Sequence, residues 1–316
     1  MLFVFHSFSL PNWWVESPPS FRYNAAMNSS QPDQAVDYLV IGHITRDLTP
    51  HGPRVGGTAA YAALLANRSG LRTGVVTSTA GDLDLSPLRG ISILNIPSQE
   101  TTTFQNSYSP QGRKQIILAK ADPISFHDIP LTWRKAKIVH LAPVIQEIPP
   151  PSGSDFPDAG LGFSLQGWLR GTRPSGRVDY LSPAVDFPEY SRREAAGVVS
   201  LEDLDGRESR LEPLLDLFST LILTRGTRPL SIYRAGNSHS VSVQPRPEID
   251  PTGAGDIFAA AFFISYFLRG NARKSARAAA DLAATSVDKP GLAGVPAESE
   301  LKKILKVNQA WEKSIP

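Results

Sequence analysis

Cysteine is absent from the 316 residues of this chain, and its absence removes several kinds of chemistry at once. Without thiols the chain has no disulfide, no cysteine nucleophile and no cysteine-based zinc site. The six histidines are scattered and show no spacing that is typical of metal ligands. We therefore expect a cytoplasmic protein whose chemistry depends on oxygen groups.

An excess of charge of one sign is also missing, because 32 lysines and arginines stand against 30 aspartates and glutamates. The resulting net charge of +2 creates no field over the whole molecule that would attract nucleic acid or anionic lipid. Basic clusters such as Arg192-Arg193 and Lys302-Lys303 are short. We expect neither a nucleic acid nor a membrane as a partner.

Long apolar runs are missing from the N-terminal segment. Residues 1–10 are mildly apolar but too short for a membrane span, and the first basic residue is Arg22, so a secretory signal is a poor interpretation. Several prolines follow, and Met27, which precedes Asn-Ser-Ser, is a second candidate for the translation start. We expect residues 1–35 to form a disordered or loosely docked extension, with the part before Met27 arising from a misassigned translation start.

From residue 36 onward, short apolar strands alternate with helices. An alanine-rich helix is expected at 58–69, and three more helices are expected at 254–268, 272–287 and 298 to about 313. The expected strands are 38–41, 73–79, 138–141, 162–165, 198–199, 221–223 and 231–233. This β–loop–α–β order predicts one α/β domain over residues 36–316 with a mostly parallel sheet.

One segment departs from this order. Residues 101–108 and 113–119 are both rich in β-forming side chains, and the stretch from Ser109 to Gly112 joins them. The pattern predicts an antiparallel hairpin inserted into the parallel α/β chain. Such a hairpin often forms a lid over a site or a contact between subunits.

The most informative segment is Asp-Pro-Thr-Gly-Ala-Gly-Asp at residues 250–256, directly before the apolar run 257–268. It predicts a turn that opens a helix, whose free N–H groups and dipole favour an anion. A carboxylate repels a bound phosphate, so Asp256 has no use in a loop that only binds phosphate. Its presence is explained if Asp256 takes a proton from a hydroxyl. The N–H groups of Gly253, Ala254 and Gly255 would then hold the phosphoryl group that this hydroxyl attacks. The alternative is that Asp256 only complements the helix dipole.

Separated motifs along residues 36–306 resemble the ribokinase-like (PfkB) carbohydrate kinase family, in the order that the family shows. They are Gly42-His-Ile-Thr-Arg-Asp47, Gly56-Gly57, Leu223-Thr-Arg-Gly226, the heptapeptide 250–256 and the loop Val287-Asp-Lys-Pro-Gly-Leu-Ala-Gly294. The resemblance implies a three-layer α/β fold in which helices flank a mostly parallel sheet, with a small β-hairpin lid at about 99–120.

The same resemblance implies ATP-dependent phosphorylation of a hydroxyl on a small polyol, a sugar or a cyclitol such as inositol. Asp256 would be the general base, and Asp47, Gly56 and Gly57 would bind the substrate. The nucleotide would be bound by Thr224, Gly226, Thr252 and Gly291. Implied cofactors are ATP and Mg²⁺, with room for a monovalent cation, and the lid allows a homodimer.

Within the family, Gln99-Glu-Thr-Thr-Thr103, Lys120-Ala-Asp-Pro-Ile124 and the Asp-Pro form of the heptapeptide are similar to inositol-kinase-like members. The chain departs from the family's Asn-x-x-Glu motif, which organises Mg²⁺ through water. The nearest match is Ser200-Leu-Glu-Asp203, so Asp203 is the candidate for this role. Glu189 and Glu194 are alternative acids.

Two other functions stay open at this point. One is a catalytically inactive relative that binds or regulates, which the altered Mg²⁺ motif would favour. The other is a nucleoside kinase of the same fold. A nicotinamide-dependent oxidoreductase is disfavoured, because no Gly-x-Gly-x-x-Gly follows the first strand.

Overall fold

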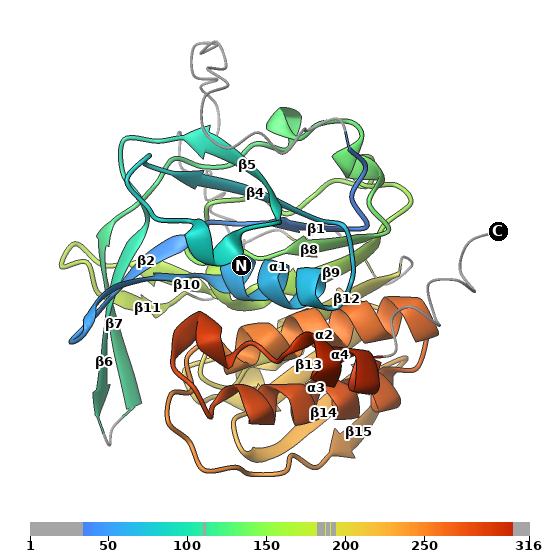
Figure 1. Ribbon diagram of the computed structural model, residues 1–316. Helices are drawn as coiled ribbons and strands as arrows, with labels where there is room; N and C mark the ends of the chain where they lie inside the picture. The colour runs from blue at the N-terminus through green and yellow to red at the C-terminus, as the bar shows by residue number, and fades with distance from the viewer. Residues whose placement is uncertain (1–33, 110–111, 182–186, 188–189, 191–193, 306–316) are drawn as a thin grey trace, which may run out of the picture. The chain divides into compact units, whose positions relative to one another are not determined.

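A computed structural model describes residues 34–109, 112–181, 187, 190 and 194–305. Its centre is a nine-stranded sheet in the order β15-β14-β13-β12-β9-β8-β1-β4-β5 (Figure 1). The strands are β1 (Tyr38–Ile41), β4 (Thr73–Thr79), β5 (Ser92–Pro97), β8 (Ile138–Leu141), β9 (Gly160–Ser164), β12 (Ala195–Ser200), β13 (Thr220–Arg225), β14 (Arg228–Arg234) and β15 (Asn237–Val241). Neighbours pair in parallel from β13 to β5, whereas β14 and β15 are antiparallel.

Side chains of the central strand β1 alternate between two hydrophobic cores. Tyr38 and Val40 belong to one core, and Leu39 and Ile41 belong to the other, because successive strand residues point to opposite faces. All of these side chains are fully buried. The apolar run in β1 therefore reflects a strand that is covered on both faces, as in α/β folds.

The α-helices of the described residues contribute to the core that contains Tyr38 and Val40 (Figure 1). They are α1 (Thr58–Arg68), α2 (Ala254–Arg269), α3 (Ala272–Ser286) and α4 (Glu298–Leu305). The other core contains side chains from short 3₁₀ helices, among them Trp133, Trp168 and Leu211. The expected three layers are present, with loops and short 3₁₀ helices in place of α-helices in the second outer layer.

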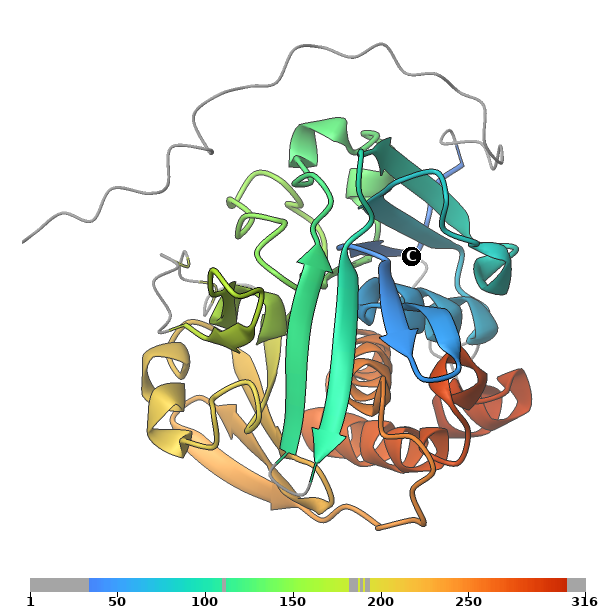
Figure 2. The same cartoon turned by 90° about the vertical axis from the view of Figure 1, so that its left-hand side faces the viewer.

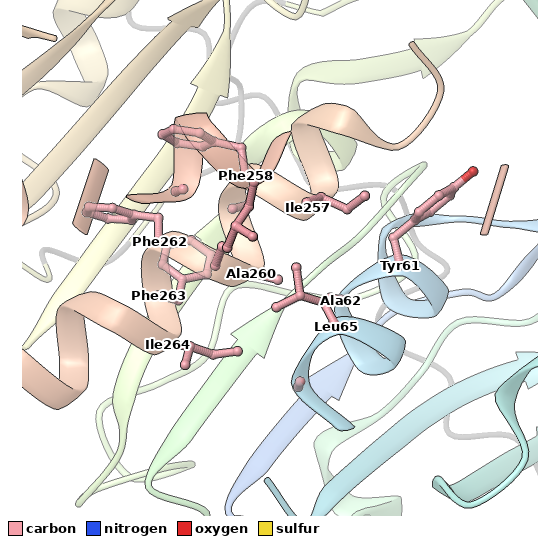
Figure 3. Close-up of a cluster of buried hydrophobic side chains, with 14 of the residues drawn as sticks. Tyr61, Ala62, Leu65, Ile257, Phe258, Ala260, Phe262, Phe263 and Ile264 are labelled. Carbon is pink, nitrogen blue, oxygen red and sulfur yellow. The ribbon is translucent and has the colours of Figure 1, made fainter. Parts of the chain in front are cut away.

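Helices α1 and α2 pack closely because their facing sides are small or branched. Figure 3 shows Ala62 and Leu65 of α1 turned toward Ala260 and Ile264 of α2. These side chains are fully buried, and short side chains let two helix backbones approach each other. The packing fixes the start of α2 relative to the start of α1.

A second sheet of four strands has the order β3-β2-β6-β7. Its strands are β2 (Thr45–Thr49), β3 (Gly52–Gly56), β6 (Thr103–Ser109) and β7 (Gly112–Ala119). In Figure 2 the green strands β6 and β7 run side by side, next to the blue pair β2 and β3. We call these four strands the lid sheet. The expected hairpin is present, but the lid sheet is larger, because the segment after β1 adds two strands to it.

A short hairpin supports the lid sheet from the side. Its strands are β10 (Arg170–Thr172) and β11 (Val178–Tyr180), and the amide of Ile117 in β7 donates to the carbonyl of Gly176 in its turn at 2.8 Å. Gly176 has φ +78°, and a Cβ there would lie 2.7 Å from the carbonyl oxygen of Ile117. A glycine is therefore required at this contact.

Most expected elements are confirmed. Strands 38–41, 73–79 and 138–141 and the helix starts at Thr58, Ala254 and Ala272 lie where the sequence predicted them. The last expected helix is confirmed as far as Leu305, and its remainder lies outside the described residues. The extension expected at 1–35 lies almost wholly outside them and stays a prediction. Across the described part of the chain, no helix is long and apolar enough to cross a membrane.

Candidate active site

A cavity that is partly open to solvent lies between the lid sheet and the start of α2. Its wall combines carboxylates, amides, hydroxyls and one guanidinium with a few apolar groups. The lining residues are Thr45, Asp47, Gly57, Thr58, Tyr61, Phe104, Asn106, Gln115, Val144, Gln166, Arg170, Thr252, Gly253 and Asp256. Five of the residues that the sequence singled out, Asp47, Gly57, Thr252, Gly253 and Asp256, thus share one cavity.

Asp256 lies in the first turn of α2 and receives a hydrogen bond from the Thr58 hydroxyl, with 2.7 Å between Oγ1 and Oδ1. Thr58 is the first residue of α1 and is 1% exposed. The close packing of α1 on α2 therefore sets the orientation of the carboxylate. An aspartate held by a hydroxyl at the wall of a polar cavity is suited to act as a general base.

Gly253 forms the N-cap of α2 in the left-handed conformation, with φ +84°. A Cβ at this position would lie 2.2 Å from the Tyr61 ring, so the position excludes every other residue type. Gly255 differs, since no atom lies within 4 Å of the place of its Cβ. Gly253 permits the turn, whereas a side chain at Gly255 would meet only open space.

The helix start offers N–H groups for an anion, as the first turn of any α-helix does. One of the three groups predicted to serve this purpose already has a partner, because the amide of Ala254 donates to the Pro251 carbonyl at 3.2 Å. The roles of Gly253, Ala254 and Gly255 in binding a phosphoryl group stay predictions.

Asp47 lies within β2, a strand that the sequence analysis did not predict. The Thr45 hydroxyl donates to its Oδ1 at 3.0 Å, and a Cβ on Gly56 would lie 2.3 Å from its Oδ2. Gly56 therefore makes room for the Asp47 carboxylate, while Gly57 lines the cavity itself. At Gly57, φ is +87° and a Cβ would lie 2.5 Å from the His43 carbonyl.

A buried network fixes the turn between β1 and β2. Glu147 is fully buried and accepts hydrogen bonds from the backbone amides of His43, Val144 and Ile145 at 2.7 to 3.0 Å. Burial lowers the pKa of His43, whose Nε2 donates to the Asp122 carbonyl at 3.0 Å. A neutral imidazole then accepts from the Thr102 hydroxyl at Nδ1, at 2.7 Å. The network connects β2 to both ends of the lid hairpin.

Asp250 connects the turn before α2, the loop around Gly291 and strand β3 of the lid sheet. Its carboxylate accepts from the amide of Thr252 at 2.9 Å and from the amide of Gly291 at 3.1 Å. The guanidinium of Arg54, on β3 of the lid sheet, lies 3.8 Å from Oδ2. Asp250 thus ties the turn before α2 to the loop around Gly291. The role of Gly291 in binding a nucleotide stays a prediction.

Thr224 and Gly226 lie at the end of β13 and do not line the cavity. Thr224 is the register partner of Ser200 on β12. Arg225, between them, binds the carboxylate of Glu208 through Nε at 2.7 Å and through its second terminal nitrogen at 2.9 Å. The role of Thr224 and Gly226 in binding a nucleotide stays a prediction.

The Asp203 carboxylate, the candidate for organising Mg²⁺, is already engaged. Oδ1 accepts from Arg170 at 2.9 Å, and Oδ2 accepts from the Ser200 amide at 3.0 Å and the Ser200 hydroxyl at 2.6 Å. Among the described residues, no group of three or more histidines, aspartates or glutamates is arranged to hold a metal ion. These residues do not fit direct ligation of Mg²⁺ by Asp203, and the predicted contact through water is not tested by this geometry.

Several cavity residues were not predicted from the sequence as site residues. They are Thr45, Thr58, Tyr61, Phe104, Asn106, Gln115, Val144, Gln166 and Arg170. A signal existed for Thr58, since it follows the glycine pair at a helix start. Asn106 and Gln115 are register partners on β6 and β7, a pairing that appears only once the hairpin has formed.

Comparison with known proteins supports the family. Residues 169–299 match the pfkB family carbohydrate kinases. A cytidine kinase of Thermococcus kodakarensis is 26% identical over 268 residues, which cover 73% of this chain and 88% of that protein. A nucleoside kinase of Methanothermobacter thermautotrophicus is 24% identical over 292 residues, 82% of this chain and 87% of that protein.

Solved structures share the fold. A pyrophosphate-dependent kinase of the ribokinase family, complexed with a pyrophosphate analog and myo-inositol, has a TM-score of 0.68 at 19% identity and covers 84% of this chain and 100% of its own. Arabidopsis thaliana ribokinase, complexed with ribose and ATP, has a TM-score of 0.61 at 17% identity, with 86% and 99% covered.

The fold has the ribokinase-like architecture, and the family match over residues 169–299 indicates a phosphotransferase. The match over residues 169–299 to the pfkB family carbohydrate kinases agrees with the resemblance that the sequence motifs predicted.

Proposed function

We propose that this protein transfers the γ-phosphoryl group of ATP to a hydroxyl of a small polyol, a sugar or a cyclitol. The observation that carries the proposal is the placement of two carboxylates, Asp47 and Asp256, on the wall of one polar cavity at the start of α2. Carboxylates accept hydrogen bonds from hydroxyls, and a helix start favours a phosphoryl group. The cavity thus offers complementary places for acceptor and donor.

In this proposal Asp47 accepts a hydrogen bond from one acceptor hydroxyl and fixes the position of the acceptor. Asp256 removes the proton from a second hydroxyl as the oxygen of that hydroxyl forms a bond to the γ-phosphorus. The bond between this phosphorus and the bridging oxygen of the donor breaks, and ADP leaves. Thr58 keeps the Asp256 carboxylate aimed at the reacting hydroxyl, and the start of α2 stabilises the charge on the phosphoryl oxygens.

A Mg²⁺ ion bound with ATP would neutralise charge on the phosphate oxygens. Solved relatives of this fold include one described as complexed with ATP and Mg²⁺. Asp203 does not fit as a direct ligand, because both of its oxygens have partners. We assign none of the steps above to the ion.

A nucleoside acceptor is the second candidate, and the two sequence relatives named above support it. Support for an inositol-like acceptor comes from structural neighbours described as myo-inositol kinases and from the polar lining of the cavity. A nucleobase needs an apolar or stacking surface, and Tyr61 and Phe104 are the aromatic residues in this wall. The polar majority of the lining favours the polyol.

The test is a turnover screen with purified full-length protein. ATP and pyrophosphate would each be offered as donors with myo-inositol, hexoses, ribose, cytidine and other nucleosides, and Asp256→Asn would serve as the control for contaminating kinases. We expect ATP consumption that depends on a polyol and disappears in the variant. Turnover with nucleosides alone would replace the polyol proposal by the nucleoside one. A complete lack of turnover with every pair would favour a binding or regulatory protein.

The lid sheet also supports the proposed homodimer. Ile116 and Leu118, on the same side of β7, are 39% and 54% exposed, which is unusual for large apolar side chains next to each other on one face. Sedimentation of the wild type and of an Ile116→Lys, Leu118→Lys double variant would test it. We expect a dimer for the first and a monomer for the second, and two monomers would contradict the proposal.

A further inference from the structure

A continuous chain of hydrogen bonds connects the lid sheet to the main sheet across the cavity wall. In β6 and β7, Gln115 donates to the side-chain oxygen of Asn106 at 3.0 Å, and its own oxygen accepts from Arg170 at 3.3 Å. Arg170 then donates to Asp203 at 2.9 Å, and Asp203 accepts from the Ser200 hydroxyl at 2.6 Å. The chain ends at Ser200, the last residue of β12.

The central pair of this chain is buried. The side chains of Arg170 and Asp203 are 10% and 7% exposed. Burying two charges costs free energy that their attraction often does not recover, so a buried pair is weak evidence for a role in stability. A role for the pair in positioning a group at the cavity is the better explanation, because Arg170 also lines the cavity.

The local geometry of Asp203 favours such a role. The amide of Asp203 donates to the Ser200 hydroxyl at 3.0 Å, while that hydroxyl and the Ser200 amide donate back to the carboxylate. The carboxylate is therefore locked in one orientation before it meets the guanidinium. Arginine presents its donors in a fixed planar fork, so a fixed carboxylate fixes the arginine as well.

Arg170 also sits where two supports of the lid meet. It begins β10, whose hairpin contacts β7 through the amide of Ile117 and the carbonyl of Gly176, while its side chain contacts Gln115 of the same strand. Asn106, Gln115 and Arg170 all line the cavity. Loss of the side-chain contact would leave this part of β7 held to the main body by the backbone contact and by the packing of Ile117 against Val144 and Ile145.

We propose that Arg170, positioned by Asp203, fastens lid strand β7 over the acceptor cavity and thereby sets the affinity for the acceptor. Asp203 acts through Arg170 in this role. As an inference about acceptor binding it rests on the proposed kinase function, whereas the fastening itself is a property of the protein without substrate. The group that Arg170 faces in the cavity is expected to be an electron-rich oxygen of the acceptor, which a guanidinium can bind as a charged donor.

Amide hydrogen exchange on the full-length protein without substrate tests the fastening. The variants are Asp203→Asn, which weakens the hold on Arg170, and Gln115→Ala, which removes the lid partner and leaves the buried pair intact. We expect exchange of the amides in residues 103–107 and 115–119 to become about tenfold faster in both variants, the loss expected for one hydrogen bond. Peptides from β8 and β9 should keep their wild-type rates, which shows that the protein has not simply loosened as a whole.

The matched control is Asp205→Asn, because Asp205 pairs with Arg210 at 3.1 Å but is 57% exposed and lies outside the cavity lining. This variant should leave the exchange of the lid unchanged. Unchanged exchange of the lid in both Gln115→Ala and Asp203→Asn would overturn the proposal.

Steady-state kinetics provides the second readout, with an acceptor that the wild type uses. We expect Asp203→Asn and Gln115→Ala to raise KM for the acceptor about tenfold or more, with a smaller change in KM for ATP, and to raise ATP hydrolysis without acceptor. A change in the Mg²⁺ concentration needed for activity, without a change in the exchange of the lid, would overturn the proposal and support the metal role of Asp203. Faster lid exchange in the two variants, together with a wild type that phosphorylates nothing, would support the fastening and refute the kinase function separately.

Discussion

The hydroxyl of Thr58 donates a hydrogen bond to the carboxylate of Asp256 across 198 residues of sequence, with 2.7 Å between Oγ1 and Oδ1. Each residue lies in the first turn of its helix, and the buried contact between α1 and α2 keeps the two starts together. The proposed base is thus oriented by a second helix, so its function depends on packing at a distance from the reacting atoms.

This contact leads to a graded prediction for turnover. Asp256→Asn should lower kcat by about 10²- to 10⁴-fold, because the amide cannot take the proton. Thr58→Val keeps the shape of the side chain and removes the hydrogen bond, so kcat should fall by about tenfold. Titration calorimetry should show nucleotide binding in both variants. Near-wild-type turnover of Asp256→Asn would refute the assignment of the base.

Alanine substitutions at the two glycines of the heptapeptide should have different effects on the free energy of unfolding. Gly253→Ala should lower the free energy of unfolding by about 2–4 kcal/mol, because the methyl group meets the Tyr61 ring and the backbone is left-handed. Gly255→Ala should leave it unchanged or raise it by up to about 1 kcal/mol, since its Cβ points into open space on a helix. Urea unfolding measures both values, and equal losses would show that the turn is not shaped as described.

Gly255→Ala should nevertheless lower kcat while its stability is kept. Its methyl group would enter open space in the first turn of α2, and it would hinder a phosphoryl group held by the N–H groups of this turn as proposed. Unchanged kcat in this variant would place the phosphoryl group elsewhere.

Substitution of Asp250 is expected to lower the affinity for the nucleotide more than the affinity for the acceptor. Asp250→Ala removes the acceptor of the Thr252 and Gly291 amides, so the turn and the nucleotide loop lose their common support. We expect the Kd for ATP to rise about tenfold or more, and Asp250→Asn, which keeps one oxygen, to have a smaller effect. The exposed Asp216, outside the cavity lining, provides the control Asp216→Asn. A larger effect on KM for the acceptor than on ATP affinity would contradict the assignment.

Much of the fold could be predicted because it depends on local patterns. The strands β1 and β8 are continuous apolar runs, and α1 is rich in alanine, so each is recognisable from its own residues. The glycine at 253 likewise indicates a turn before α2, and its backbone is left-handed in the structure. The strands β2 (Thr-Arg-Asp-Leu-Thr) and β3 (Gly-Pro-Arg-Val-Gly) were missed because Asp, Gly and Pro, which are depleted in strands, interrupt their β-forming residues. Their pairing with each other and with β6 stabilises them, and such long-range pairing is not visible in a single sequence.

The site was predicted in the same uneven way. Asp47 and Asp256 were predicted from motifs, but Thr58 as the partner of Asp256 and Arg170 as the partner of Asp203 were not. Each of these contacts joins segments that meet only after folding. Asp203 shows the limit most clearly, since an acidic side chain after a strand end looks the same whether it meets a hydrated ion or a buried arginine.

The buried histidines predict how stability changes with pH. His140 lies between the Tyr38 hydroxyl, 2.6 Å from Nδ1, and the Ser164 hydroxyl, 2.8 Å from Nε2. Burial lowers the pKa of His140 from its ordinary value of 6.5 to about 3, and burial also lowers the pKa of His43. The folded protein therefore holds both imidazoles neutral at pH values where the unfolded chain protonates them.

The sign of the effect follows from proton binding. Above the unfolded pKa of 6.5 the stability is fully present, and between 6.5 and about 3 the unfolded chain binds more protons than the folded protein at His140. The free energy of unfolding should therefore fall on acidification, by at most about 1.4 kcal/mol per pH unit for each such histidine. Urea unfolding between pH 7.5 and 4.5 measures this slope, to which carboxylates add a common background. His140→Gln should be less stable than the wild type at pH 7 but should show a smaller slope, and His239→Gln, on the exposed side of β15, should keep the wild-type slope. An unchanged slope in His140→Gln would show that His140 is not held neutral by its surroundings.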